Sequence, residues 1–372
     1  MFLVLSLIYA FVGFNEMSLK TNHRKLLCFV CLFPAFFLTA FRDVSVGNDT
    51  ITYFRAFDYV AHFENVLDAI KFSRMEAGYV LLNYVFSHAN QSYYCMQFWI
   101  SLFVYAALFF FLCRYSKNIS LSCFVFLTLR FMLGPMVVVR MWIALSILLF
   151  ALFLLEKNKK LLFSICVIIA SQFHLSALIF FPLLFLLNVK LNKKSIFTLI
   201  ILSFIILGLG KTFFSYLTQF FYSYQGYLDG KYFDVQDNIA IYIQFFIDLV
   251  LSLFVWLANN AVTYKVNRPD EKMLSFDSPH HLSMDFICNW SIVLILCLDI
   301  IGLNNAIMNR LSGYFMFAWL YLLPKAFLKI SNKYGAFLLF LIVIFFFILQ
   351  FQIVMVYRPN WNGVEPYSFY FE

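Results

Sequence analysis

The chain has 372 residues, of which 63% are hydrophobic and only 12% are charged, and its formal net charge is +8. A soluble domain carries about a quarter charged residues, so this composition excludes an ordinary soluble protein. The basic residues lie between apolar blocks and form no continuous stripe, which excludes nucleic acid as a partner. The sequence therefore predicts an all-α integral membrane protein with a single polytopic membrane domain over residues 1–372.

The apolar blocks predict about twelve transmembrane helices, some of them short or re-entrant. In chain order they cover residues 2–14, 26–41, 93–113, 119–133, 136–155, 161–173, 175–189, 196–209, 239–262, 284–302, 311–329 and 335–356. The first block lacks the basic leading segment and the cleavage site of a signal peptide, so we expect it to be retained. Gln172 and His174 stand at the junction of two short blocks. A break at membrane depth is tolerated only where it lines protein or water, so this junction predicts a cavity.

The distribution of Lys and Arg predicts the orientation of these spans. Placing the basic loops on the cytoplasmic side puts the N-terminus outside and makes every inner loop basic. Residues 42–92 and 210–238 then form two long periplasmic loops, and residues 263–283 form a cytoplasmic loop. Residues 77–86 are apolar but too short to span, so we expect a re-entrant or interfacial helix within the first outer loop.

Charged side chains gather at the outer ends of the predicted spans. Arg140 heads an uncharged apolar run directly after Gly134-Pro135, and a guanidinium at a bilayer centre costs about 2.5 to 3.5 kcal/mol. It should therefore face a wet cavity or an anion. The same outer side receives Arg42, Asp43, Asp49, Arg55, Glu76, His174 and Arg310. Taken singly, a boundary Arg often reaches to headgroups and a lone His is often structural, but their convergence on one side indicates a substrate pathway.

The sequence contains no motif for a cofactor or a metal. The eight cysteines all fall in or beside apolar blocks and are expected to be small buried hydrophobic residues. The pair His280-His281 lies in a polar loop, where solvated histidines are more common than metal ligands. Nucleotide-binding and zinc-hydrolase motifs are absent. We therefore expect neither a cofactor nor a bound metal.

Six short motifs follow one another along the chain. The first is G-x-D-T-x-x-Y, which runs from Gly47 through Asp49 to Tyr53. The later ones are E-x-G-x-x-x-L-N from Glu76 to Asn83, R-x-x-I-A from Arg140 to Ala144, F-H-x-S-A from Phe173 to Ala177, R-x-x-x-Y from Arg310 to Tyr314, and the pair Pro366-Tyr367. In this order they resemble the motifs of EpsG-family and O-antigen polymerase (Wzy-type) membrane proteins. The chain departs from that pattern at Met141, where many members carry Gln, and at Ala77, where Pro is common, and neither change removes a charge.

The resemblance implies a fold similar to the C-type (GT-C) glycosyltransferases and a polymerase of lipid-linked oligosaccharides. The expected location is the bacterial inner (cytoplasmic) membrane, with the active site facing the periplasm. The donor and the acceptor would both be undecaprenyl-diphosphate-linked oligosaccharides. Further partners would be membrane lipids, a chain-length regulator and a flippase of the same pathway.

Roles for individual residues follow from that chemistry. Arg140 and Arg310 are expected to bind the departing diphosphate with Arg42 assisting, because fixed guanidinium groups can neutralise phosphate without a metal. His174 and Glu76 rank together as the base that accepts the hydroxyl proton, with Asp49 behind them. The motif residues expected to contact sugar are Tyr53, Asn83 and Tyr314.

Two other classes of protein stay open. A membrane O-acyltransferase acting on cell-surface glycans would use an intramembrane His as base, but it would usually pair that His with Asn or Asp in sequence. A lipid-linked oligosaccharide flippase would carry charges on both faces and a twofold internal repeat. Neither pattern is visible here.

Overall fold

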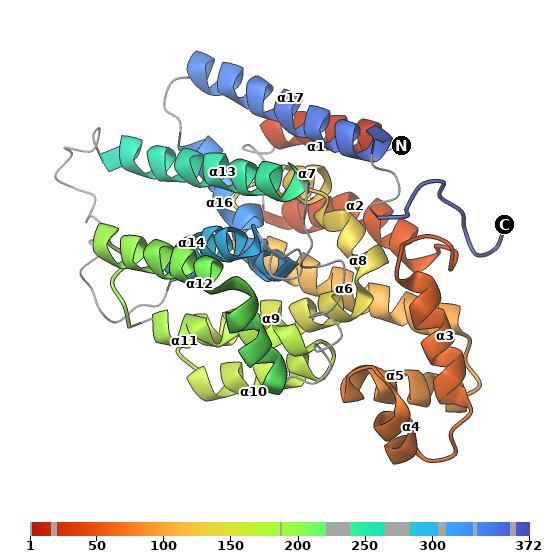
Figure 1. Ribbon diagram of the computed structural model, residues 1–372. Coiled ribbons are helices and arrows are strands. Elements are labelled where there is room, and N and C mark those ends of the chain that lie inside the picture. The colour runs from red at the N-terminus through yellow and green to blue at the C-terminus, as the bar shows by residue number, and fades with distance from the viewer. Residues whose placement is uncertain are drawn as a thin grey trace. The chain divides into compact units, whose positions relative to one another are not determined.

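The computed structural model describes residues 2–15, 21–186, 188–220, 239–263, 283–303, 310–329, 333–357 and 362–372. Within these ranges every regular element is a helix, apart from one isolated antiparallel bridge between Arg42 and Phe369 (Figure 1). The predicted all-α class is therefore confirmed for this part of the chain.

The helices of the N-terminal half are α1 (Phe2–Asn15), α2 (Thr21–Ala40), α3 (Thr50–Ala61), α4 (Val66–Phe72), α5 (Ala77–His88), α6 (Tyr93–Tyr115), α7 (Ile119–Thr128), η2 (Phe131–Leu133), α8 (Gly134–Val137), α9 (Val139–Glu156) and α10 (Lys160–Ser171). Those that follow are η3 (Leu175–Phe180), α11 (Pro182–Leu186), α12 (Lys193–Phe220), α13 (Ile239–Thr263), α14 (Met284–Gly302), η5 (Gly313–Phe315), α16 (Phe317–Leu328) and α17 (Lys333–Tyr357). Every predicted span coincides with one helix or with consecutive short helices.

Within the described residues, five helices are long and apolar enough to cross a membrane. They are the helical stretches His23–Ala40, Tyr93–Tyr115, Val139–Glu156, Ile241–Asn259 and Met284–Gly302. A sixth span is possible if Ile119–Thr128 and Phe131–Val137, which are bent by 72° at a short break, cross together. Several long apolar helices make this a multi-pass membrane protein. Other predicted spans correspond to shorter apolar helices, so the larger number of spans stays a prediction.

The predicted loops at residues 210–238 and 263–283 are only partly described. Helix α12 continues to Phe220, well beyond the predicted end of its span at residue 209. An isolated glycine costs a helix interior only about 1 kcal/mol, so Gly208 and Gly210 do not end it. Residues 221–238 of the predicted outer loop and 264–282 of the predicted cytoplasmic loop lie outside the described residues.

The chain divides into two compact units. Unit 1 comprises Met1–Leu155, Lys159–Leu178 and Ile330–Glu372, and unit 2 comprises Glu156–Asn158 and Ile179–Lys329. In unit 2, helices α12, α13 and α16 pack around α14, with Trp290 and Trp319 fully buried.

Unit 1 is built on two packed helix pairs, α2 with α6 and α1 with α7. Phe36 of α2 meets the rings of Phe98 and Tyr105 of α6 edge-on, with centroids 5.7 and 6.0 Å apart. The segment between α2 and α6 folds into three helices of its own, α3, α4 and α5, shown in orange in Figure 1. They enclose a small apolar core of Val60, Ala69 and Val80, and helix α5 covers the predicted interfacial helix at 77–86.

Candidate functional site

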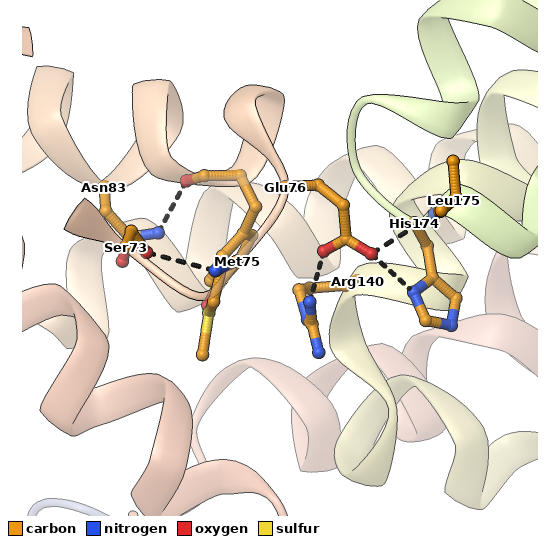
Figure 2. Close-up of polar contacts among 8 residues, drawn as sticks. Ser73, Met75, Glu76, Asn83, Arg140, His174 and Leu175 are labelled. Atoms are coloured by element: carbon orange, nitrogen blue, oxygen red, sulfur yellow. Dashed lines mark hydrogen bonds and ion pairs between the residues drawn. The ribbon is translucent and has the colours of Figure 1, made fainter. Parts of the chain in front are cut away.

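Glu76 stands at the residue before helix α5, where the backbone is still extended, with φ −64° and ψ 146°. Its side chain makes no capping bond to its own helix. Because a residue in this position need not follow the helix surface, the carboxylate can project across to other segments. It points toward the break between α10 and η3 (Figure 2).

Gly78 permits the close approach that brings these two segments together. Its amide donates a hydrogen bond to the Gln172 carbonyl at 2.8 Å. A Cβ at this position would lie 2.8 Å from the same oxygen, closer than a carbon atom can normally come. A residue without a side chain therefore allows the start of α5 to sit against Gln172, two residues before His174.

Both oxygens of the Glu76 carboxylate are engaged (Figure 2). Oε1 accepts a hydrogen bond from His174 Nδ1 at 3.1 Å and another from the Leu175 amide at 3.2 Å. Oε2 forms an ion pair with Nη1 of Arg140. The carboxylate thus joins three segments, the starts of α5 and α9 and the break after α10.

Arg140 lies in the first turn of α9, at the head of the apolar span, as the sequence predicted. The anion that it faces in the structure is Glu76. The side chains of Arg140, Glu76 and His174 are 23%, 20% and 25% exposed, so the cluster is half-buried yet open to a ligand. The Nε of Arg140 is buried and has no acceptor among the described residues.

The charge state of Glu76 follows from these contacts. Burial alone would raise the pKa of this carboxyl, but the hydrogen bond from His174 and the charges of Arg140 and His174 outweigh burial and lower the pKa to about 2. Glu76 is therefore ionised at neutral pH. A group with so low a pKa is a poor proton acceptor, and the carboxylate is better suited to orienting its neighbours.

Tyr53 lies beside this cluster. The Tyr53 ring is 4% exposed and its centroid lies 5.8 Å from the guanidinium carbon of Arg140. Burial raises the pKa of Tyr53, the Arg140 charge lowers it and the Asp49 carboxylate raises it, so both charges act on its hydroxyl. Tyr53 also meets Tyr79 edge-on at 5.6 Å. Asn83 is 1% exposed, and its side-chain amide donates a hydrogen bond to the Tyr79 carbonyl at 2.6 Å.

Arg42 is buried inside unit 1, with 1% of its surface exposed. Its Nη1 donates to the Thr39 carbonyl, and its Nε has no acceptor among the described residues. Burial lowers the pKa of Arg42, while surrounding tyrosine hydroxyls oppose that shift: Tyr93, Tyr367, Tyr79 and Tyr105. The predicted role of Arg42 at the diphosphate stays a prediction, and the structure places its side chain in an interior position.

Two predicted site residues belong to unit 2 and are described only within it. Arg310 is exposed at the start of a helical turn. Tyr314 is 1% exposed, and its ring lies 6.3 Å from that of Phe180. In unit 1 the structure brings together Glu76, Arg140 and His174, with Tyr53 beside Arg140.

Three contributors to this cluster were not predicted from the sequence: the Leu175 amide, the close approach at Gly78 and the buried Tyr79. The glycine two residues after Glu76 was the available signal. Among the described residues, no three His, Cys, Asp or Glu side chains converge in a way that could hold a metal ion. The cluster itself offers one fixed cation, one imidazole and one carboxylate.

Comparison with known proteins identifies the family. No curated protein and no solved structure matches the chain, so the predicted likeness to C-type glycosyltransferases stays a prediction. A family model described as the EpsG family matches residues 24–369, a range that includes every motif of the site. This family is associated with Wzy-type polymerases and supports a role resembling polysaccharide polymerisation. The chain belongs to the EpsG family.

Proposed function

We propose that this protein polymerises oligosaccharide repeat units carried on polyprenyl diphosphate, for O-antigen or exopolysaccharide. The growing glycan is transferred from its lipid diphosphate to a sugar hydroxyl of a new lipid-linked unit. The observation that carries the proposal is the single carboxylate, Glu76, that binds both Arg140 and His174. Family membership and the apolar helices support the same reaction class.

His174 is the proton acceptor in this proposal. When the neutral ring donates from Nδ1 to the Glu76 carboxylate, the basic lone pair is on Nε2. Glu76 also stabilises the imidazolium that forms when Nε2 takes a proton, as a buried carboxylate does in other acid–base sites. The acceptor oxygen then bonds to the anomeric carbon of the donor, and the bond from that carbon to the diphosphate oxygen breaks.

Arg140 binds the departing lipid diphosphate. One of its amino groups is paired with Glu76, and the side chain remains 23% exposed. A guanidinium offers several N–H donors in a fixed plane, so it can hold a carboxylate on one side and a phosphate oxygen on another. A preorganised cation in a half-buried site stabilises developing negative charge far more than it would in water.

The remaining predicted residues keep the roles expected from the sequence. In unit 1, Tyr53 lies beside Arg140, and Asp49, Tyr53 and Asn83 are proposed to bind sugar hydroxyls, with Arg42 adding positive charge from the interior. Arg310 and Tyr314 belong to unit 2, and they are proposed to bind the diphosphate and the sugar respectively. The site is proposed to face the periplasm, with the protein in the bacterial inner membrane and undecaprenyl as the lipid.

Product analysis tests this function against its alternatives. Purified protein in lipid vesicles would be given lipid-linked repeat units, and the products separated by gel or thin-layer chromatography. Longer glycans, formed with release of lipid diphosphate, support the polymerase. Unlengthened units with added acyl mass would show an O-acyltransferase, and chemically unchanged units moved across the bilayer would show a flippase.

A further inference from the structure

The C-terminal segment, residues 362–372, lies along the loop formed by residues 41–49, which we call loop 41–49. Four backbone hydrogen bonds join them. Gly47 N donates to Gly363 O at 2.7 Å and Asn48 N to Asn362 O at 3.1 Å. At the other end, Asp43 N donates to Ser368 O at 3.0 Å and Tyr370 N to Phe41 O at 3.2 Å. The contact therefore runs along almost the whole of loop 41–49.

Side chains of the C-terminal segment add to this contact. The Tyr367 hydroxyl donates to the Leu38 carbonyl at 2.6 Å, beside the buried Arg42. The Tyr370 ring stacks on Tyr94 with centroids 4.5 Å apart, and the Tyr94 hydroxyl donates to the Asp43 carboxylate at 3.1 Å. These interactions make the C-terminal segment an integral part of unit 1.

Gly363 marks the closest approach between the two. Its φ of +58° lies in the left-handed region, which side chains other than glycine rarely adopt. A Cβ at this position would also lie 2.2 Å from the Asn48 side-chain oxygen. Asn48 immediately precedes Asp49, so any displacement at Gly363 is passed to the start of helix α3, which carries Tyr53.

We infer that the C-terminal segment is a positioning element of the site, which holds in place the start of helix α3, with Asp49 before it and Tyr53 beside Arg140. The inference rests on the proposed function. Loop 41–49 has backbone hydrogen bonds of its own, such as the one that Val46 N donates to Asp43 O at 3.1 Å. Those bonds shape the turn. The four bonds from the C-terminal segment, together with those that Gln97 Nε2 donates to the Ala40 and Arg42 carbonyls, fix where the turn lies. Asp49 and Tyr53 are the proposed sugar-binding side chains, so the segment acts on substrate binding, while the base His174 is held by other elements.

A crosslink tests whether the segment stays docked during turnover. The hydroxyl oxygens of Ser45 and Ser368 lie 3.3 Å apart on the exposed side of the contact, so a S45C/S368C double variant should form a disulfide with little movement. Mass spectrometry of the linked peptides detects it without any activity assay. We expect polymerisation within about twofold of the two single variants, before and after reduction. Failure to crosslink, or activity that returns only on reduction, would overturn the inference.

Kinetics test the positioning role. Gly363→Ala should raise the apparent KM for the lipid-linked acceptor about tenfold or more, with a smaller change in kcat and an unchanged pH profile. Gly208→Ala is the matched control, since a Cβ there meets nothing within 4 Å. A lower kcat with an unchanged KM, or kinetics like the wild type, would contradict the positioning role.

A milder variant covers the case in which Gly363→Ala does not fold. Tyr367→Phe removes the hydroxyl that donates to Leu38 and keeps the ring, and it should raise the same KM about threefold, the effect of one neutral hydrogen bond. An unchanged KM in this variant would also contradict the inference. Failure of the wild type to polymerise would instead remove the proposed function, and the crosslink would still report whether the segment is docked.

Discussion

The Glu76 carboxylate accepts a hydrogen bond from Nδ1 of His174 at 3.1 Å, although 98 residues separate the two in sequence. The same carboxylate pairs with Arg140, which lies 64 residues away along the chain. One side chain therefore orients the proposed base and the proposed diphosphate ligand together. Changes at Glu76 should affect both proton transfer and anion binding.

Replacing Glu76 by Gln should lower the polymerisation rate about a thousandfold, because the amide cannot hold the imidazole in the required tautomer or stabilise its charged form. The measurement is turnover of lipid-linked units by the purified variant, with helical content compared by circular dichroism. Glu64→Gln is the matched control, since Glu64 is exposed and, like Glu76, lies in the segment between α2 and α6. A Glu76→Gln rate within twofold of the wild type would remove the carboxylate from the mechanism.

Arg140→Ala and Arg140→Lys should both abolish polymer formation while the protein still inserts into the membrane. Lysine keeps the charge but loses the planar fork of donors that serves Glu76 and phosphate at once. Glycan ladders from cells and the amount of membrane-inserted protein provide the two readouts. Lys71→Ala, which removes an exposed cation on α4, should leave the ladder intact. Normal polymer from Arg140→Ala would end the assignment.

Gly78→Ala should lower the polymerisation rate about 10 to 100-fold. The new Cβ forces the start of α5 away from Gln172 and so moves the Glu76 carboxylate out of hydrogen-bonding distance of His174. The neighbouring Ala77→Pro variant is the control. Residue 77 is the first of the helix and Glu76 already has an extended backbone, a setting that accepts proline. Similar losses in both variants would show that the close approach at Gly78 has no special role.

Stability should depend on the protonation of Glu76 at acid pH. The folded-state pKa is about 2 against an ordinary value of 4.5, so the folded state favours the charged form. This contribution, of the order of 3 kcal/mol, is fully present above pH 4.5 and is lost as the pH falls toward 2. Thermal unfolding of wild type in detergent should therefore show a falling Tm over that window. In Glu76→Gln the fall should be smaller, and parallel curves for the two proteins would contradict the pairing.

Positions of the membrane helices followed well from the sequence. Residues 284–302 were predicted as a span, and α14 runs from Met284 to Gly302. The reason is that long apolar runs with basic flanks have few other structures open to them. The lengths of the helices on either side of Gln172 and His174 were less predictable. Short apolar runs can be half-buried helices, as α10 and η3 are.

The candidate site was predictable in its residues but not in its pairing. Charges on one predicted side of the membrane singled out Glu76, Arg140 and His174, since charges in apolar surroundings are uncommon. Their mutual contacts depend on a backbone approach at Gly78 that a pattern of residue types does not display. Arg42 shows the same limit, because a cation at the end of an apolar run can face water, lipid headgroups or, as here, a cage of tyrosines.

The most direct test of the central claim is the pH dependence of polymerisation by purified wild type and His174→Gln protein. An imidazole base titrates near neutrality, whereas Glu76 stays ionised throughout the range from pH 6 to 8. The wild-type rate should rise with pH across this range, and the His174→Gln rate should be at least about a hundredfold lower and flat. A His174→Gln enzyme with the wild-type rate and the wild-type pH profile would contradict the account.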